Sequence, residues 1–179
     1  MNGRYTFIGT IVVLLILNMA ASTAIAKKPD TTGKPEKQTT LYLYQKDPET
    51  WEIVDHGAWG KMKYIPVGTE LQFNFQAHKL LPEQWYSLIY YPDPWPGYGL
   101  IILAETMSDL DGNLQIKDAI DLGDLPRSSD DNYPSGAKIW LVLSEDISLR
   151  PRCMMNWNPT EYLFEDNLIT FDDTDYYQR

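Results

Sequence analysis

The feature that most constrains the fold is a series of short apolar segments separated by turn-forming residues. Residues 69–75, TELQFNF, place an apolar side chain at every second position, the period typical of a half-buried strand. Residues 85–91, 100–105 and 137–144 are denser in branched and aromatic side chains, as in strands covered on both faces. Shorter segments of the same kind are residues 41–45, 51–54, 57–64, 113–117 and 168–171. We predict a mainly β fold, an antiparallel two-sheet sandwich of the immunoglobulin-like or jelly-roll-like type.

One short helix is expected near the C-terminus. In the stretch Asn158-Pro159-Thr160-Glu161, the Asn can cap a helix and the Pro suits its first position, while the Glu can reach back to the cap. We expect this helix to extend through Phe164 and to be followed by the segment at residues 168–171.

The N-terminal residues have the pattern of a secretory signal peptide. Arg4 precedes an apolar core at residues 7–17, and Ala24-Ile25-Ala26 supplies small residues for cleavage. The alternative is an uncleaved anchor, but the apolar run is shorter than the roughly 20 residues that span a bilayer. We therefore expect a secreted or extracytoplasmic protein with no membrane span after cleavage.

The remaining chain divides by composition. We expect a signal peptide at residues 1–26, a flexible polar linker at 27–40, a single domain at 41–172 and an acidic tail at 173–179. Because Cys153 is the sole cysteine, no intrachain disulfide can form, so core burial must hold the domain together. We expect the Cys153 thiol to be buried as a small apolar group.

The charge argues against one class of partner. The formal net charge is −10, and the acidic residues are concentrated in the second half of the chain. A protein of this charge has no basic surface for a phosphate backbone, so we expect no nucleic-acid binding.

Four stretches resemble a family of uncharacterised secreted proteins found mainly in methanogenic archaea. These are LYLYQKDPETWEIVDHGAWGKMKY, WYSLIYYPDPWPG, GAKIWLVLSEDI and WNPTEYLFEDNLITF, and the resemblance covers nearly all of residues 41–171. It implies an archaeal, extracytoplasmic protein with a compact β-rich domain. It implies no catalytic residues and no established activity.

Two clusters of acidic residues suggest a calcium site. The turn Asp109-x-Asp111-Gly112-Asn113 places oxygen ligands two residues apart around a glycine, and Asp130 and Asp131 follow later. If the two loops met at one edge of the fold, these five side chains could bind Ca²⁺. The alternative is a hairpin turn in which the Asp and Asn side chains bond to the backbone.

Aromatic residues are the other candidates for a binding site. In LIYYPDPWPGYGLI, residues 88–101, three prolines end a strand and stiffen the turn that carries Trp95. Trp95 either covers the end of the sheet or projects outward to stack on a sugar ring. The candidate contacts are Trp95, Tyr98 and Trp59, together with Trp51.

Catalytic patterns are sparse. His56 and His78 are the two histidines, no Gly-x-Ser-x-Gly motif occurs, and no histidine follows Cys153 as a copper site would require. We expect a non-catalytic module with a structural or binding role at the cell envelope or exterior, its partner an envelope protein or a glycan. The alternatives are a calcium-stabilised carbohydrate-binding module and a small carboxylate-dependent hydrolase.

Overall fold

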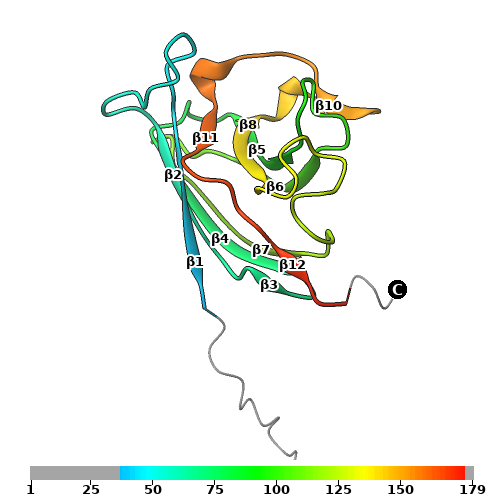
Figure 1. The fold of residues 1–179 in the computed structure, drawn as a ribbon. Coiled ribbons are helices and arrows are strands. Elements are labelled where there is room, and N and C mark those ends of the chain that lie inside the picture. Colours follow the sequence, from blue (N-terminus) through cyan, green and yellow to red (C-terminus); the bar gives the residue numbers. More distant parts are fainter. Residues whose placement is uncertain (1–36, 176–179) are drawn as a thin grey trace, which may run out of the picture. The chain divides into compact units, whose positions relative to one another are not determined.

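The computed structural model describes residues 37–175 of the chain (Figure 1). The predicted signal peptide, most of the predicted linker and the last four residues of the predicted tail lie outside this range. Among residues 37–175, no helix is long and apolar enough to cross a bilayer. The first strand begins at Thr39, two residues before the predicted start of the domain.

The described residues form strands and two single turns of 3₁₀ helix. The strands are β1 (Thr39–Tyr44), β2 (Trp59–Tyr64), β3 (Val67–Gly68), β4 (Leu71–His78), β5 (Trp85–Tyr91), β6 (Ile101–Met107), β7 (Leu114–Ile120), β8 (Lys138–Leu143), β9 (Ile147–Leu149), β10 (Arg152–Met154), β11 (Leu163–Glu165) and β12 (Asp172–Asp173). The helical turns are η1 (Ser144–Asp146) and η2 (Pro159–Glu161). The prediction of a mainly β fold is confirmed.

Eight strands form one antiparallel sheet in the order β6-β5-β8-β11-β1-β2-β4-β7. The sheet bends until it is nearly barrel-like, which brings its two edge strands, β6 and β7, near each other. Figure 1 shows β1, β2, β4 and β7 along one side of the bend, and β5, β6, β8 and β11 along the other. The predicted two-sheet sandwich is not confirmed: eight strands form one sheet, and β9 with β10 and β3 with β12 form two small two-stranded sheets. Alternation identifies the buried face of a strand but not the sheet to which the strand belongs.

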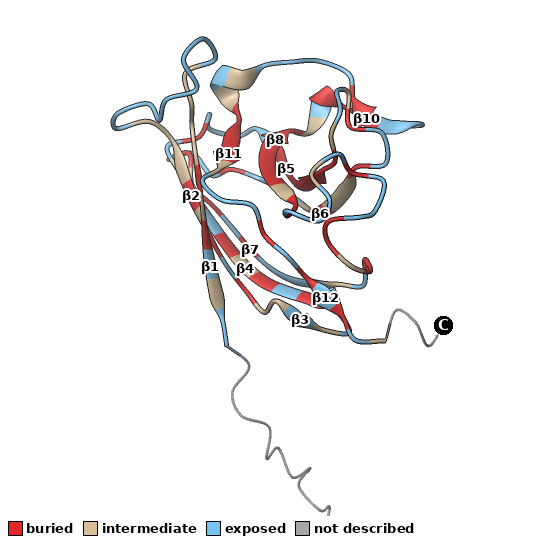
Figure 2. Ribbon diagram, viewed as in Figure 1, coloured by how far each residue is buried: buried red, intermediate tan, exposed pale blue. Residues whose placement is uncertain are grey.

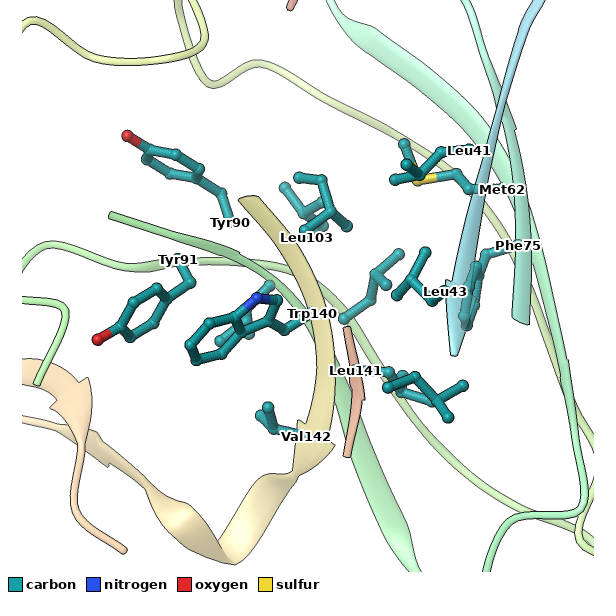
Figure 3. Packing of buried hydrophobic residues seen from close by; sticks show 14 of the residues in the cluster. Leu41, Leu43, Met62, Phe75, Tyr90, Tyr91, Leu103, Trp140, Leu141 and Val142 are labelled. Carbon is teal, nitrogen blue, oxygen red and sulfur yellow. The ribbon is translucent and has the colours of Figure 1, made fainter. Parts of the chain in front are cut away.

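The inside of the bend is filled by apolar side chains. In β4, Leu71, Phe73, Phe75 and Ala77 are buried, and the residues between them are exposed or partly exposed, as the alternation in the sequence predicted (Figure 2). Figure 3 shows Leu141 of β8 lying toward Leu43 of β1 and Phe75 of β4. Burying a leucine or phenylalanine side chain completely contributes about 1.5–3 kcal/mol to the stability of the folded state.

Strands β5 and β8 are buried on both faces. All of β5 after Trp85 and all of β8 after Lys138 are buried. On the outer face, Tyr91 and Trp140 are covered by the segments at residues 92–99 and 144–162, which are joined by a hydrogen bond from the Met154 N–H to the Pro96 carbonyl oxygen. Cys153 is also buried here, as predicted.

The prediction of a C-terminal helix is wrong: the structure has only the single turn η2 at this place. The Asn158 side chain does not cap that turn but donates to the Asp146 carboxylate. Residues 163–165 instead form β11, which pairs with both β1 and β8, because two strand ladders satisfy more backbone groups than one isolated helical turn can. The predicted strand at 168–171 is reduced to isolated bridges at Ile169 and Phe171.

Candidate functional site

An open pocket lies on the outer face of β5 and β8. Its volume is about 540 Å³, which lies within the range of small-molecule sites. We call it the aromatic pocket, and its lining residues are Trp51, Tyr91, Asp93, Trp95, Lys138, Trp140 and Trp157.

Two stacked rings form the floor of the aromatic pocket. Tyr91 ends β5 and Trp140 lies in the adjacent strand β8; their ring centroids are 3.8 Å apart with an interplanar angle of 10° (Figure 3). Both side chains are almost completely buried. Burial, with the nearby Asp93 and Asp130 carboxylates, raises the pKa of Tyr91 to about 12, so its phenol remains neutral at physiological pH.

Three tryptophans form the walls, and each remains about half exposed. The exposed fractions of Trp51, Trp95 and Trp157 are 52%, 50% and 42%. The Trp157 ring lies 6.4 Å from that of Trp51 at 71°, and 5.5 Å from that of Trp95 at 80°. Because the rings meet edge to face at steep angles, they do not form one flat surface.

A buried carboxylate fixes the segment that carries Trp157. Asp146 is 1% exposed, and its carboxylate accepts hydrogen bonds from the Asn158 amide at 2.9 and 3.0 Å and from the Tyr162 hydroxyl at 2.6 Å. Its main-chain carbonyl accepts from the Met155 N–H at 2.7 Å. The chain is therefore anchored on both sides of Trp157. Burial and the bond to Asp146 raise the pKa of Tyr162 well above its usual value.

A second buried carboxylate fixes the proline turn that carries Trp95. Asp130 is 3% exposed and accepts from the Tyr90 hydroxyl at 2.7 Å, the Asp93 N–H at 3.2 Å and the Asn132 N–H at 2.9 Å. The turn also needs a glycine at position 97. Gly97 has a φ of +73°, and any larger residue there would place its Cβ 2.4 Å from the Tyr91 ring. Both features hold the turn against the floor of the pocket.

Trp51 has an unusual backbone conformation. Its φ is +62°, a left-handed value that is rare for a bulky residue. The Trp51 N–H donates to the Asp47 carbonyl at 2.8 Å, and the Trp51 ring packs 4.9 Å from that of Phe164. Such strain persists only where the surroundings fix it, and is enriched at functional sites.

A polar pair lies at the edge of the aromatic pocket. The Asp93 carboxylate forms an ion pair with the Lys138 ammonium, and its Oδ2 also accepts from the Asn132 amide at 2.7 Å. Both side chains of the pair are about one quarter exposed. Within residues 37–175, Asp93 Oδ1 accepts no hydrogen bond from the protein.

Glu165, at the end of β11, is a partly buried acid that interacts with the Lys138 ammonium. Burial raises the pKa of Glu165 to about 7, while its own backbone N–H, the Lys138 and Lys46 ammonium groups and the Trp140 indole N–H lower it in part. Glu165 Oε2 is buried without a hydrogen-bond partner among the described residues.

The aromatic residues that the sequence singled out fall in different places. Trp95 and Trp51 line the aromatic pocket. Trp59 lies in β2, where its ring packs 4.7 Å from that of His78, and Tyr98 is 67% exposed and does not line the pocket. Trp157, which was not among the sequence candidates, follows β10 in a stretch without strand periodicity.

The proposed calcium ligands do not form one cluster. Asp109 Oδ1 accepts from the N–H groups of Asp111 at 2.9 Å and Asn113 at 2.8 Å, and these bonds lower the pKa of Asp109. Asp130 belongs to the network beneath the proline turn, and Asp131 is exposed. Across residues 37–175, no group of three or more His, Cys, Asp and Glu side chains is arranged to hold a metal. The observed bonds are those of the alternative, a hairpin turn.

Comparison with protein-family models, curated proteins and solved structures returned no match. The fold and the site define a β protein with a nearly barrel-like sheet that carries an open aromatic pocket on its outer face.

Proposed function

We propose that this chain is an exported, non-catalytic binding module whose aromatic pocket binds carbohydrate. A sugar ring has C–H faces that pack on indole rings and hydroxyl groups that need hydrogen-bond partners. The observation that carries the proposal is the gathering of three half-exposed tryptophans around the Asp93–Lys138 pair. Large aromatic side chains are normally buried, so their joint exposure favours a ligand.

The way in which the walls are held supports a binding role. Asp146 and Asp130 fix the segments that carry Trp157 and Trp95, and both carboxylates are buried. A ligand that meets walls already in position does not have to offset the entropy of ordering them. The hydrogen-bond networks therefore favour affinity without adding contacts of their own.

Binding without cleavage is favoured over the hydrolase alternative. Glycoside hydrolysis generally uses two carboxyl groups that flank the scissile bond. Among the residues that line the aromatic pocket, Asp93 is the one acid, and it is paired with Lys138. Export is supported by the sequence pattern of the first 26 residues alone.

The proposal is tested by titrating the purified protein with a panel of soluble glycans and following tryptophan fluorescence. We expect at least one glycan to change the emission, and Trp157→Ala to weaken its binding at least about tenfold. Trp85→Ala is the matched control, because Trp85 is 52% exposed but lies outside the aromatic pocket, and it should bind like the wild type. A panel without any response, or equal binding by Trp157→Ala, would overturn the proposal.

A further inference from the structure

We infer that the aromatic pocket takes one neutral sugar residue of a glycan, with two neighbouring hydroxyl groups held by Asp93 and Lys138. This inference rests on the proposed function and specifies the ligand of the same site. It excludes two other classes of carbohydrate, the flat surface of a long polysaccharide and sugars that carry a carboxylate.

The arrangement of the walls limits the length of the ligand. A polysaccharide surface packs best on rings that share one plane, but the Trp157 ring stands at 71° to Trp51 and at 80° to Trp95. The ring centroids are 6.4 and 5.5 Å apart, so a chain lying across all three would meet ring edges. A single sugar residue can instead pack on the exposed part of these tryptophans, next to the Asp93–Lys138 pair.

The polar edge limits the chemistry of the ligand. Lys138 has an ammonium group with three N–H donors, and one of them serves the Asp93 carboxylate. Asp93 Oδ1 is left as an acceptor. Each sugar hydroxyl can both donate and accept, so one hydroxyl can donate to Asp93 while its neighbour accepts from Lys138.

The local charge disfavours an acidic sugar. The Lys138 ammonium is already neutralised by Asp93, and a further carboxylate, Asp130, accepts the Asp93 N–H from behind. Among the residues that line the aromatic pocket, Lys138 is the one cation, and it is already paired. The carboxylate of a uronic acid would therefore meet the like charge of Asp93, which is a repulsive element against that ligand.

The test compares methyl glycosides of glucose, galactose and mannose with the matching uronic acids, and with neutral oligosaccharides of increasing length, by calorimetric titration. We expect the preferred neutral glycoside to bind at least about tenfold more tightly than its uronic acid. For the neutral oligosaccharides, we expect the affinity to rise by less than about threefold when the chain grows beyond two sugar residues.

Two variants connect the preference to the polar pair. Asp93→Asn removes the like charge and frees Lys138, so it should reduce the discrimination against the uronic acid; Lys138→Met should weaken the neutral glycoside at least about fivefold. Thermal melting of each variant checks that it is folded. Equal binding of neutral and acidic sugars, or affinity that climbs steadily with chain length, would overturn the inference while the proposed carbohydrate binding stands. Loss of all glycan binding would remove both.

Discussion

Aspartates in two parts of the molecule, the aromatic pocket and the turn between β6 and β7, have contrasting roles. In the turn, Asp109 is exposed and accepts hydrogen bonds from Asp111 and Asn113, two and four residues away. At the pocket, Asp130 and Asp146 are buried and accept from residues up to 40 positions away in the chain. A turn held by local hydrogen bonds can keep its structure without contacts to distant residues. A binding site built from separate loops needs buried hydrogen-bonding groups that hold those loops together.

The largest expected effect compares Asp146→Ala with Asp109→Ala. Without the Asp146 carboxylate, the Tyr162 hydroxyl and the Asn158 amide lose their buried acceptor, which should lower the free energy of unfolding by about 2–4 kcal/mol. Asp109→Ala removes bonds to exposed N–H groups that water can replace, and should cost about 1 kcal/mol or less. Urea unfolding measures both, and equal losses would contradict the comparison.

The next effect concerns pH and is specific to Glu165, the partly buried acid that interacts with Lys138. The pKa of Glu165 is raised from 4.5 to about 7, so the folded protein holds this proton more tightly than the unfolded chain does. Its contribution to stability is therefore present at low pH and is lost as pH rises from about 4.5 to about 7, by an amount on the order of 2–3 kcal/mol. The pKa of the exposed Asp109 is lowered instead, so its contribution has the opposite sign.

Glu165→Gln tests this pH dependence, because the amide is neutral at every pH and of similar size. Between pH 5 and pH 8 the variant should lose less unfolding free energy than the wild type does, as measured by urea denaturation at each pH. Asp109→Asn serves as the control and should leave the decline of the wild type over this range in place. Parallel curves for Glu165→Gln and the wild type would show that Glu165 titrates normally.

The smallest expected effect is that of calcium on the acidic turn. Asp109 Oδ1 already accepts hydrogen bonds from two N–H groups, and Asp130 belongs to the separate network beneath the proline turn. We expect millimolar calcium to shift the melting midpoint by less than about 1 °C, whereas a micromolar site would add about 4 kcal/mol. A rise of several degrees that disappears in Asp109→Ala would restore the calcium hypothesis.

Much of the secondary structure could be predicted from the sequence. The alternation in β4 and the dense apolar runs of β5 and β8 reflect burial on one or both faces, which side-chain type records directly. The three residues of β11 could not be found this way, because a strand so short has no period and follows a helix-start signal. Its structure is determined by pairing with strands far away in the chain.

The candidate site was less predictable than the strands. Trp95 was marked by the prolines around it, but Trp59 and Tyr98 looked equally suitable in the sequence and do not line the aromatic pocket. The walls come from three segments, around Trp51, Trp95 and Trp157, that meet only in the folded chain. Whether an aromatic ring stays exposed depends on how these three segments pack together. Composition alone therefore could not identify the pocket.

The position of β11 in the sheet has a consequence for the order of assembly. Strand β11 lies between β8 and β1, so it joins the group β6-β5-β8 to the group β1-β2-β4-β7. In the β1–β11 ladder, Glu165 pairs with Leu43, which precedes it by more than a hundred residues in the chain. During synthesis, each group can form its own ladders before residues 163–165 exist. The junction between the two groups can form only after residues 163–165 are synthesised, and such long-range pairing is typical of domains that fold in milliseconds to seconds.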